Sequence, residues 1–372
     1  MMKAADECEP RIKKEKKMSD RVMVRDVAVG GGAPVSIQSM TNVDSRDEKA
    51  LMRQIRELED AGCEIIRISV PDMEALETFR AVRKQTDSPL VADIHFDYRL
   101  AVGSIEAGAD KVRINPGNIG SPERVKAVVD AAKAARIPIR VGVNSGSLEK
   151  DILEKYGHVT AEALAESALR NVKMLEDMDF GDIVISIKSS DVRMTYDAYR
   201  IAASKTSHPF HVGITEAGTL RRGQVKSATG IGALLLAGIG DTIRVSLTSD
   251  PVNEVYFAKE ILEAIGFREP KFDIVSCPTC GRTKIDLEPL VDDVEKRLND
   301  LESEQDIDIP TGLKVAVMGC VVNGPGEARE ADFGICGGDR QGLIIRKGEV
   351  IKKVEESALA EELINAIREE YN

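Results

Sequence analysis

Several common features are scarce or absent in this chain of 372 residues. It has no tryptophan, few other aromatic residues and only four histidines. No apolar run approaches the length that a membrane-spanning helix needs. Residues 1–20 mix acidic and basic side chains without an apolar core, so we expect a disordered extension and not a secretory signal. These absences exclude an integral membrane protein with a helical anchor.

Cysteine and basic charge are also limited. Six cysteines in a chain of this length do not form a disulfide framework, which favours a reducing cytoplasm. The formal net charge of −12 argues against a nucleic-acid-binding protein. Apolar content is that of an ordinary enzyme, and the length predicts a large domain followed by a smaller one. We place the boundary between residues 269 and 270.

Short β-branched runs alternate with amphipathic helical stretches through the first domain. Eight such runs are present, namely Val35–Thr41, Ile65–Val70, Leu90–His95, Lys111–Pro116, Pro138–Asn144, Asp182–Lys188, Pro209–Glu216 and Asp241–Thr248. Eight strand–helix units predict an α/β fold, a closed (β/α)₈ TIM-type barrel over residues 21–269. The alternative is an open doubly wound sheet, but no glycine-rich dinucleotide turn follows the first run.

Within these runs, one parity is polar and the other is almost entirely Ile, Val or Leu. Because successive strand residues point to opposite faces, the polar set faces the inside of the barrel. It includes Arg67, Asp93, His95, Arg113, Arg140, Asn144, Lys188, Arg244 and Ser246. Some of these residues form internal salt bridges, yet the cations outnumber the acids. A cationic excess inside an acidic protein indicates a site for a small anion, foremost phosphate or diphosphate.

Residues 270–372 follow a different pattern and predict a small α+β domain. We expect helices near 290–304 and 357–370 and strands near 313–318, 333–335 and 343–346. Cys277 and Cys280 form a CxxC loop, and Cys320 follows the apolar run that ends at Met318. Three such thiolates favour an iron–sulfur cluster, while half a zinc knuckle or a redox dithiol remains the alternative.

The remaining cysteines have simpler interpretations. Cys63 ends a helical stretch and is expected to pack in the core. Cys8 is an incidental thiol of the extension. Cys336, in Ile-Cys-Gly-Gly, is a candidate fourth ligand for the cluster.

The motifs together resemble one known family. They are Ser-Ile-Gln-Ser-Met-Thr at 36–41, Ala-Asp-Ile-His-Phe at 92–96, Arg-Ile-Asn-Pro-Gly at 113–117, Val-Gly-Val-Asn-Ser-Gly at 141–146, Cys-Pro-Thr-Cys at 277–280 and Gly-Cys-Val-Val-Asn-Gly-Pro-Gly-Glu-Ala at 319–328. The chain after residue 20 is similar to the 4-hydroxy-3-methylbut-2-enyl diphosphate synthases. These are iron–sulfur reductases of the methylerythritol phosphate route to isoprenoids. The direct junction of barrel and cluster domain matches the bacterial two-domain form.

The resemblance implies specific roles. A [4Fe–4S] cluster would be held by Cys277, Cys280, Cys320 and Glu327, and would pass single electrons from ferredoxin or flavodoxin. The substrate would be 2-C-methyl-D-erythritol 2,4-cyclodiphosphate, reductively opened and dehydroxylated. Residues matching diphosphate-binding positions are Arg67, Arg113, Arg140, Asn144, Lys188, Arg244 and Ser246. Asp93, His95, Thr215 and Glu216 match positions near the carbon skeleton, and Asn323 approaches the substrate from the cluster domain.

Two details stay open in this interpretation. Either Glu216 or His95 could supply a proton to the reaction. Glu216 also has the wrong parity for an inward residue if its strand is regular, because His211, Gly213 and Thr215 share the other face. We therefore expect Glu216 at the strand end, where the chain turns.

Three rival functions fit less well. A radical S-adenosylmethionine enzyme needs a CxxxCxxC loop near the first strand, and none is present. A pterin-type barrel transferase leaves the C-terminal cysteines unexplained. A non-catalytic iron–sulfur carrier has no use for a cationic barrel.

Chain topology predicts an assembly. Substrates of such barrels lie at the carboxyl ends of the strands, whereas the last helix, about 252–266, runs back to the other end. The short connection around 267–273 cannot return the cluster to its own barrel mouth. A head-to-tail homodimer resolves this, with each cluster domain serving the partner's barrel.

Overall fold

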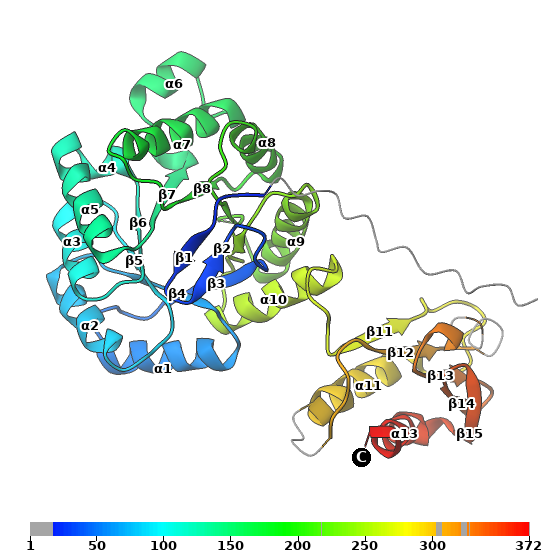
Figure 1. Cartoon of the computed structure of the whole chain (residues 1–372). Coiled ribbons are helices and arrows are strands. Elements are labelled where there is room, and N and C mark those ends of the chain that lie inside the picture. The colour runs from blue at the N-terminus through cyan, green and yellow to red at the C-terminus, as the bar shows by residue number, and fades with distance from the viewer. Residues whose placement is uncertain (1–17, 217, 303–306, 321–325, 327, 372) are drawn as a thin grey trace, which may run out of the picture. The chain divides into compact units, whose positions relative to one another are not determined.

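The computed structural model describes residues 18–216, 218–302, 307–320, 326 and 328–371. The chain divides after Phe267 into two compact units (Figure 1). Each unit has its own hydrophobic core. Each is therefore described by itself.

The first unit is a parallel eight-stranded barrel, as the sequence predicts. Its strands are β3 (Ser36–Met40), β4 (Ile65–Ser69), β5 (Leu90–Asp93), β6 (Lys111–Ile114), β7 (Ile139–Asn144), β8 (Ile183–Lys188), β9 (His211–Val212) and β10 (Thr242–Ile243). The order in the sheet is β8-β7-β6-β5-β4-β3-β10-β9. A single parallel bridge between Ile185 and Phe210 brings β8 next to β9, so the sheet almost closes into a ring.

Helices surround this ring and cover its apolar outer face (Figure 1). They are α1 (Glu48–Asp60), α2 (Met73–Arg83), α3 (Tyr98–Glu106), α4 (Pro116–Ile119), α5 (Pro122–Ala135), α6 (Lys150–Tyr156), α7 (Ala161–Glu176), α8 (Val192–Ala203), α9 (Leu220–Leu236) and α10 (Pro251–Ala264). Several begin at a capping carboxylate, such as Asp47 before α1 and Asp72 before α2. Ser121 precedes the proline that starts α5, but its side chain makes no capping hydrogen bond.

Two strands are much shorter than their sequence runs. Residues 209–216 and 241–248 read as full strands, yet β9 and β10 contain two residues each. Their chains approach very closely beyond this point, because a Cβ on Gly213 would lie 2.4 Å from the carbonyl oxygen of Arg244. The residues that follow these two short strands, Thr215, Glu216 and Arg244, line the mouth of the barrel.

A hairpin that the sequence analysis did not predict closes the amino-terminal end of the barrel. It consists of β1 (Val22–Val24) and β2 (Val27–Val29), paired antiparallel. Its valines pack against the inward side chains of Ile65, Val91 and Val184. The chain just before it is also held, since Ser19 donates a hydrogen bond to Asp241 over 2.8 Å. Ordered contacts thus begin before residue 20, while residues 1–17 lie outside the described part.

The second unit is a five-stranded mixed sheet with two helices. Its elements are β11 (Phe272–Ser276), α11 (Leu287–Glu302), β12 (Leu313–Met318), β13 (Phe333–Gly337), β14 (Gln341–Arg346), β15 (Glu349–Glu355) and α13 (Leu359–Tyr371). Strands β11, β12 and β13 are parallel, and β13, β14 and β15 are antiparallel. The α+β class is as expected. The sequence analysis missed β11 and β15, whose side chains are largely exposed.

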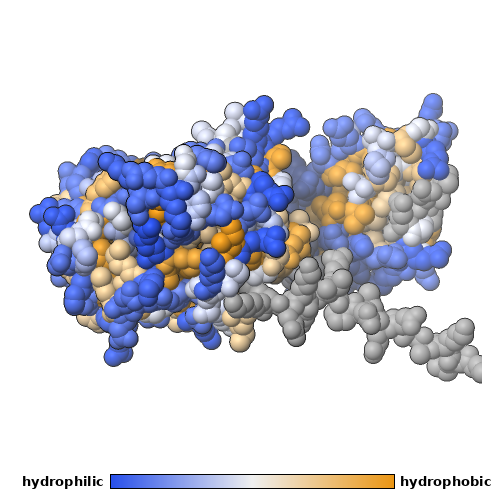
Figure 2. Space-filling model, turned by 90° about the horizontal axis from the view of Figure 1, so that it is seen from above, coloured by the Kyte–Doolittle hydropathy of each residue, from blue (hydrophilic) through white to orange (hydrophobic). Residues whose placement is uncertain are grey.

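The surface gives no sign of a membrane anchor in the described residues, where no helix is both long and apolar enough to span a bilayer. Figure 2 shows hydrophilic residues over most of the visible face of the barrel unit, with hydrophobic residues in smaller areas between them. This pattern fits the high content of charged residues.

Candidate active site

A cavity of about 530 Å³ opens at the carboxyl ends of the barrel strands. It is lined by Met40, Arg67, Asp93, His95, Arg113, Asn144, Ser145, Gly146, Ser147, Lys188, Thr215, Glu216 and Arg244. Nine of these were predicted from strand parity or from the family motifs. The carboxyl end is where barrel enzymes carry their active sites.

Two of the predicted barrel residues do not line this cavity. Arg140 lies below it and is fully buried, while Ser246 follows β10 and is half-buried. Asn323 and Glu327 lie outside the described residues. The sequence analysis in turn missed Met40 and the loop Ser145–Ser147, because neither carries a charge that parity would single out.

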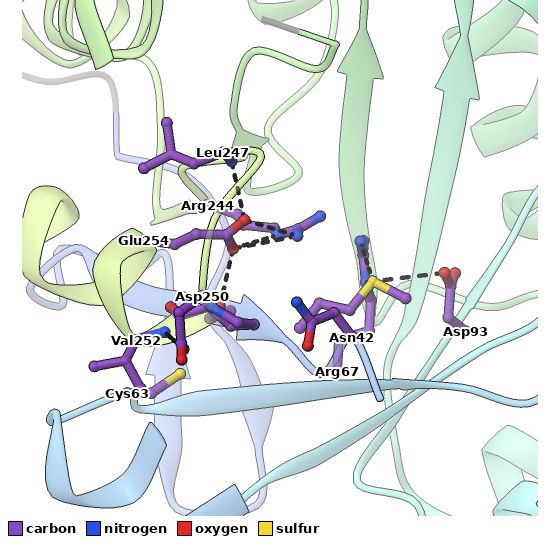
Figure 3. Close-up of polar contacts among 12 residues, drawn as sticks. Asn42, Cys63, Arg67, Asp93, Arg244, Leu247, Asp250, Val252 and Glu254 are labelled. Atoms are coloured by element: carbon purple, nitrogen blue, oxygen red, sulfur yellow. Dashed lines mark hydrogen bonds and ion pairs between the residues drawn. The ribbon is translucent and has the colours of Figure 1, made fainter. Parts of the chain in front are cut away.

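A single carboxylate stands among the arginines of the cavity. Asp93 Oδ1 accepts a hydrogen bond from Arg113 over 3.2 Å. Its other oxygen lies 3.9 Å from Arg67 Nε (Figure 3). Burial alone would raise the pKa of Asp93, but Arg67 and then Arg113 outweigh it and hold the pKa well below its usual range. Asp93 is therefore a fixed negative charge that positions both guanidinium groups.

Arg244 is positioned from outside the barrel by Glu254 of α10. Its Nε and one terminal nitrogen each donate to Glu254 over 3.2 Å (Figure 3). Glu254 also accepts from the Leu247 amide at 3.0 Å and from the Ser39 hydroxyl at 3.0 Å. The sequence analysis missed this residue, although an acid on the buried face of an otherwise apolar helix is a detectable signal.

The remaining cations are held at an electrostatic cost. The pKa of Arg67 is lowered to about 10, chiefly by burial, with Asp93 opposing the shift and Arg244 and Arg113 adding to it. Burial followed by Arg67 and Arg140 lowers the pKa of Lys188 well below its ordinary value. Positive charge thus exceeds negative charge in a largely desolvated cavity. An anionic ligand would relieve this repulsion.

Glu216 lies in the loop beyond β9, which ends at Val212, and not at the end of the strand as expected. Its backbone has a positive φ of 49°, an uncommon conformation for a residue with a side chain. This turn directs Glu216 into the same cavity as Thr215 despite their opposite parity. Across the mouth, His95 Nε2 lies 3.4 Å from Arg113. The two candidate proton donors therefore share one cavity.

Gly142 makes room for Arg113. A Cβ at this inward position of β7 would lie 2.5 Å from Arg113 Nε. The guanidinium crosses β7 at the one inward position without a side chain. Glycine in the Val-Gly-Val-Asn-Ser-Gly motif is therefore a packing requirement of the cation cluster.

The three predicted cysteine ligands lie at one end of the second unit's sheet. Cys277 follows β11 directly, and Cys320 follows the neighbouring parallel strand β12. Cys277 Sγ accepts a hydrogen bond from the Gly319 amide over 3.2 Å. Cys280 is exposed, and hydrogen bonds from the backbone and side chain of Arg282 lower its pKa. Amide and guanidinium donors of this kind stabilise thiolates.

These thiols fit a cluster by chemistry, although the described residues do not gather a complete ligand set. No group of three or more His, Cys, Asp or Glu side chains in them is arranged to hold a metal ion. The loop 321–325 and Glu327 lie outside the described part. Cys277, Cys280 and Cys320 form no disulfide, so all three carry available thiols. Such a donor set suits iron–sulfur ligation.

Cys63 and Cys336 are placed differently. Cys63 packs in the barrel core, as predicted, and burial raises its pKa to about 12. Cys336 is fully buried on β13, in a small apolar cluster against which Cys277 packs. It is therefore near the cysteine site but enclosed by apolar side chains.

Comparison with known families gives two matches that together cover most of the chain. Residues 19–259 match the GcpE TIM-barrel domain, and residues 273–369 match the GcpE protein C-terminal domain. The junction between the matches falls where the structure divides.

Curated relatives match over nearly their whole length. A protein of Caldanaerobacter subterraneus named 4-hydroxy-3-methylbut-2-en-1-yl diphosphate synthase (flavodoxin) is 55% identical over 354 residues, covering 95% of this chain and 98% of that protein. A protein of the same name from Clostridium perfringens is 56% identical, covering 95% and 99%. Among solved structures, the dihydropteroate synthase of Yersinia pestis aligns with a TM-score of 0.49 at 14% identity, covering 67% of this chain and 99% of that one.

Proposed function

The chain belongs to the family of 4-hydroxy-3-methylbut-2-en-1-yl diphosphate synthases, and on that premise we propose how its residues perform the reaction. The substrate is 2-C-methyl-D-erythritol 2,4-cyclodiphosphate. The product is 4-hydroxy-3-methylbut-2-enyl diphosphate, formed by two-electron reduction with opening of the ring and loss of a hydroxyl as water. This is a step in the supply of isoprenoid precursors.

The observation that carries the proposal is the unbalanced positive charge of the barrel cavity. Arg67, Arg113, Lys188 and Arg244 line it, and Asp93 is its only fully buried carboxylate among the described lining residues. Asp93 offsets part of the charge of Arg67 and Arg113, and Glu254 offsets that of Arg244, so the remaining positive charge favours a polyanionic ligand. A cyclic diphosphate has the charge and size for such a cavity.

The barrel residues bind and orient this substrate. The arginines neutralise the diphosphate as negative charge grows on it during ring opening. Asp93 and Glu254 hold the arginines in place, so little reorganisation is needed when the ligand arrives. His95 and Glu216 stand at the mouth of the cavity, where either can deliver a proton to a departing oxygen.

Cys277, Cys280, Cys320 and Glu327 would hold the [4Fe–4S] cluster. When bound, such a cluster supplies single electrons and a Lewis-acidic iron. The protein contributes the Gly319 amide, which donates a hydrogen bond to Cys277 Sγ, and the Arg282 donors, which lower the pKa of Cys280. Asn323, close to Cys320 in sequence, would approach the substrate.

The electron donor, the cellular setting and the assembly complete the proposal. Flavodoxin is the donor in the names of the relatives, and ferredoxin is the alternative small electron carrier. Thiol-dependent ligation favours a cytoplasmic setting. A head-to-tail homodimer follows from chain topology, since α10 returns toward the amino ends of the parallel strands before the chain enters the second unit.

Substitutions in the cavity test the anion site. Arg113→Ala and Lys188→Ala should each weaken binding of the cyclic diphosphate by about 2–5 kcal/mol, since each removes a desolvated charge partner. Iron and sulfide content should stay unchanged, because both residues belong to the barrel unit. Calorimetric titration without a reductant measures the affinity in the absence of turnover.

Lys126→Ala is the matched control. Lys126 is an exposed barrel lysine paired with Asp130 on the same helix, so its loss should leave affinity unchanged. Unchanged affinity in both cavity variants would show that the cations serve the fold and not the ligand.

A further inference from the structure

Six polar side chains form a layer inside the barrel that the proposed reaction does not use directly, apart from Arg140. This inner polar layer consists of Ser36, Gln38, Lys111, Arg140, His211 and Thr242, each at most 1% exposed. The side-chain polar atoms of these residues lack hydrogen-bond partners among the described residues. For Arg140 this holds for all three guanidinium nitrogens, and for His211 for both ring nitrogens. Buried polar atoms are normally satisfied, so the layer needs an explanation.

The layer has a defined place in the fold. Lys111 and Arg140 are the first inward residues of β6 and β7, because Val112 and Val141 between the inward positions pack on the helices. The layer borders an apolar floor, because Ile65, Val91 and Val184 lie in register with Gln38, Lys111 and Arg140 on neighbouring strands and pack against the β1–β2 hairpin. Above it lies the cation-lined cavity. Lys111 is therefore cut off from solvent on the floor side.

Charges reach the layer from most strands. Each strand from β4 to β9 contributes a charged or titratable side chain to the barrel interior, as do the segment after β10 and helix α10. In chain order these are Arg67, Asp93, Lys111, Arg113, Arg140, Lys188, His211, Arg244 and Glu254. Asp93 pairs with Arg67 and Arg113, and Glu254 pairs with Arg244. The charges acting most strongly on Lys111 are those of Arg140 and Arg67, both of the same sign as its own ammonium form.

We propose that Lys111 is a proton-binding site of the reaction cycle, neutral in the free enzyme and protonated at Nζ when a diphosphate occupies the cavity above it. The proton comes from solvent and no covalent bond is formed. Lys111 then contributes a positive charge beneath the ligand without touching it. It is a positioning residue for the charge balance of the site and not a catalytic residue.

The physical reason is that a bound diphosphate changes the electrostatic potential at Lys111 Nζ from positive toward negative. Without ligand, burial and then Arg140 and Arg67 lower the pKa of Lys111 well below its ordinary value. An ammonium group here would be desolvated and surrounded by cations, which is unfavourable. A diphosphate on Arg67 and Arg113 places two or more negative charges nearby, which offset those cations. The pKa of Lys111 then rises, and Nζ takes up a proton.

The sign of the pH dependence follows from this shift. Between the pKa of the free form and that of the liganded form, binding takes up a proton, so affinity falls as pH rises. One proton contributes a loss of about tenfold in affinity per pH unit within that window. Lys188 also has a lowered pKa and faces the ligand directly, so it adds its own uptake. The contribution of Lys111 is therefore measured as the difference in proton uptake between the wild-type protein and a Lys111 variant.

The inference rests on the proposed function, and its test separates the two. The cyclic diphosphate is titrated calorimetrically into oxidised holoenzyme, without reductant, in buffers of different ionisation enthalpy. The dependence of the observed heat on buffer gives the number of protons taken up. Lys111→Met should take up about one proton fewer than wild type and lose the matching part of the pH dependence of the affinity. Lys111→Gln provides a second neutral replacement should the methionine disturb folding.

Gln38→Met is the matched control, since it removes a buried, unpartnered polar group of the same layer that does not titrate. It should keep the proton uptake of wild type. If both Lys111 variants bind the cyclic diphosphate with unchanged uptake, the inference is overturned while the proposed function stands. If the wild-type holoenzyme binds neither the cyclic diphosphate nor inorganic diphosphate, both are overturned.

Discussion

At the scale of single residues, the barrel interior shows how a few acids control many cations. Asp93 bridges Arg67 and Arg113, and Glu254 supports Arg244 from outside the barrel. Each acid lies among basic groups that would otherwise repel one another at short range in a desolvated space. Removing one acid would leave buried charge without compensation, which is more costly than losing an exposed ion pair. These acids thus reduce the repulsion among the buried arginines enough for the barrel to fold, while the cavity keeps its positive charge.

The fourth ligand of the cluster is also a question about single residues. If Glu327 binds iron, Glu327→Ala should give a cluster that readily loses iron, with most activity lost. Cys336→Ser should keep both cluster and activity, because Cys336 is buried on β13 among apolar side chains. Anaerobic iron and sulfide analysis with visible spectra measures the cluster in each variant. The reverse pattern would assign the ligand to Cys336.

At the scale of elements, strand parity predicted most of the cavity. Alternation along β4, β5, β6, β7 and β8 separates inward polar residues from outward apolar ones, and this pattern is local and legible in sequence. The family resemblance assigned Glu216 to the site, and parity then indicated that it lies off the regular strand. Its positive φ in the loop after β9 explains how it still faces the cavity. All eight barrel strands were predicted, since each is a β-branched run between helical stretches.

Features set by contacts distant in sequence were not predictable in this way. Glu254 reaches Arg244 from a helix, and the β1–β2 hairpin is defined by the floor it covers. The close approach of Gly213 to the Arg244 carbonyl oxygen is likewise a feature of the packed barrel. The inner polar layer was visible in part, as Arg140, but its unpartnered state needs the packed barrel.

The close approach of β9 and β10 gives a prediction about these two elements. Gly213→Ala should lower the free energy of unfolding by about 1–3 kcal/mol, because the added Cβ would overlap the Arg244 carbonyl oxygen, which belongs to the backbone and cannot easily move. Gly146→Ala is the control, since a Cβ there meets nothing within 4 Å. Denaturant titration of both variants gives the comparison. Equal stability of the two would mean that β9 and β10 separate without cost.

At the scale of the whole molecule, the covalent path of the chain limits which barrel a cysteine site can serve. The 14 residues of α10 run antiparallel to the strands, a distance of about 20 Å at 1.5 Å per residue. Residues 265–271 then connect α10 to β11, and a residue spans at most about 3.5 Å. The chain therefore leaves the barrel unit at the end opposite to the cavity.

This topology leads to a prediction about mixed assemblies. If each cluster unit serves a partner's cavity in a two-fold homodimer, the complete site combines Arg113 and Lys188 of one chain with Cys320 of another. Lys188→Ala and Cys320→Ser should each be inactive alone. A heterodimer of the two contains one intact pair of cavity and cysteine site, so mixing them should restore up to about half of the wild-type activity per heterodimer. Two differently tagged chains, co-purified in sequence, isolate that species for assay. Should the isolated heterodimer be inactive while tagged wild-type heterodimers are active, each cluster must serve the barrel of its own chain.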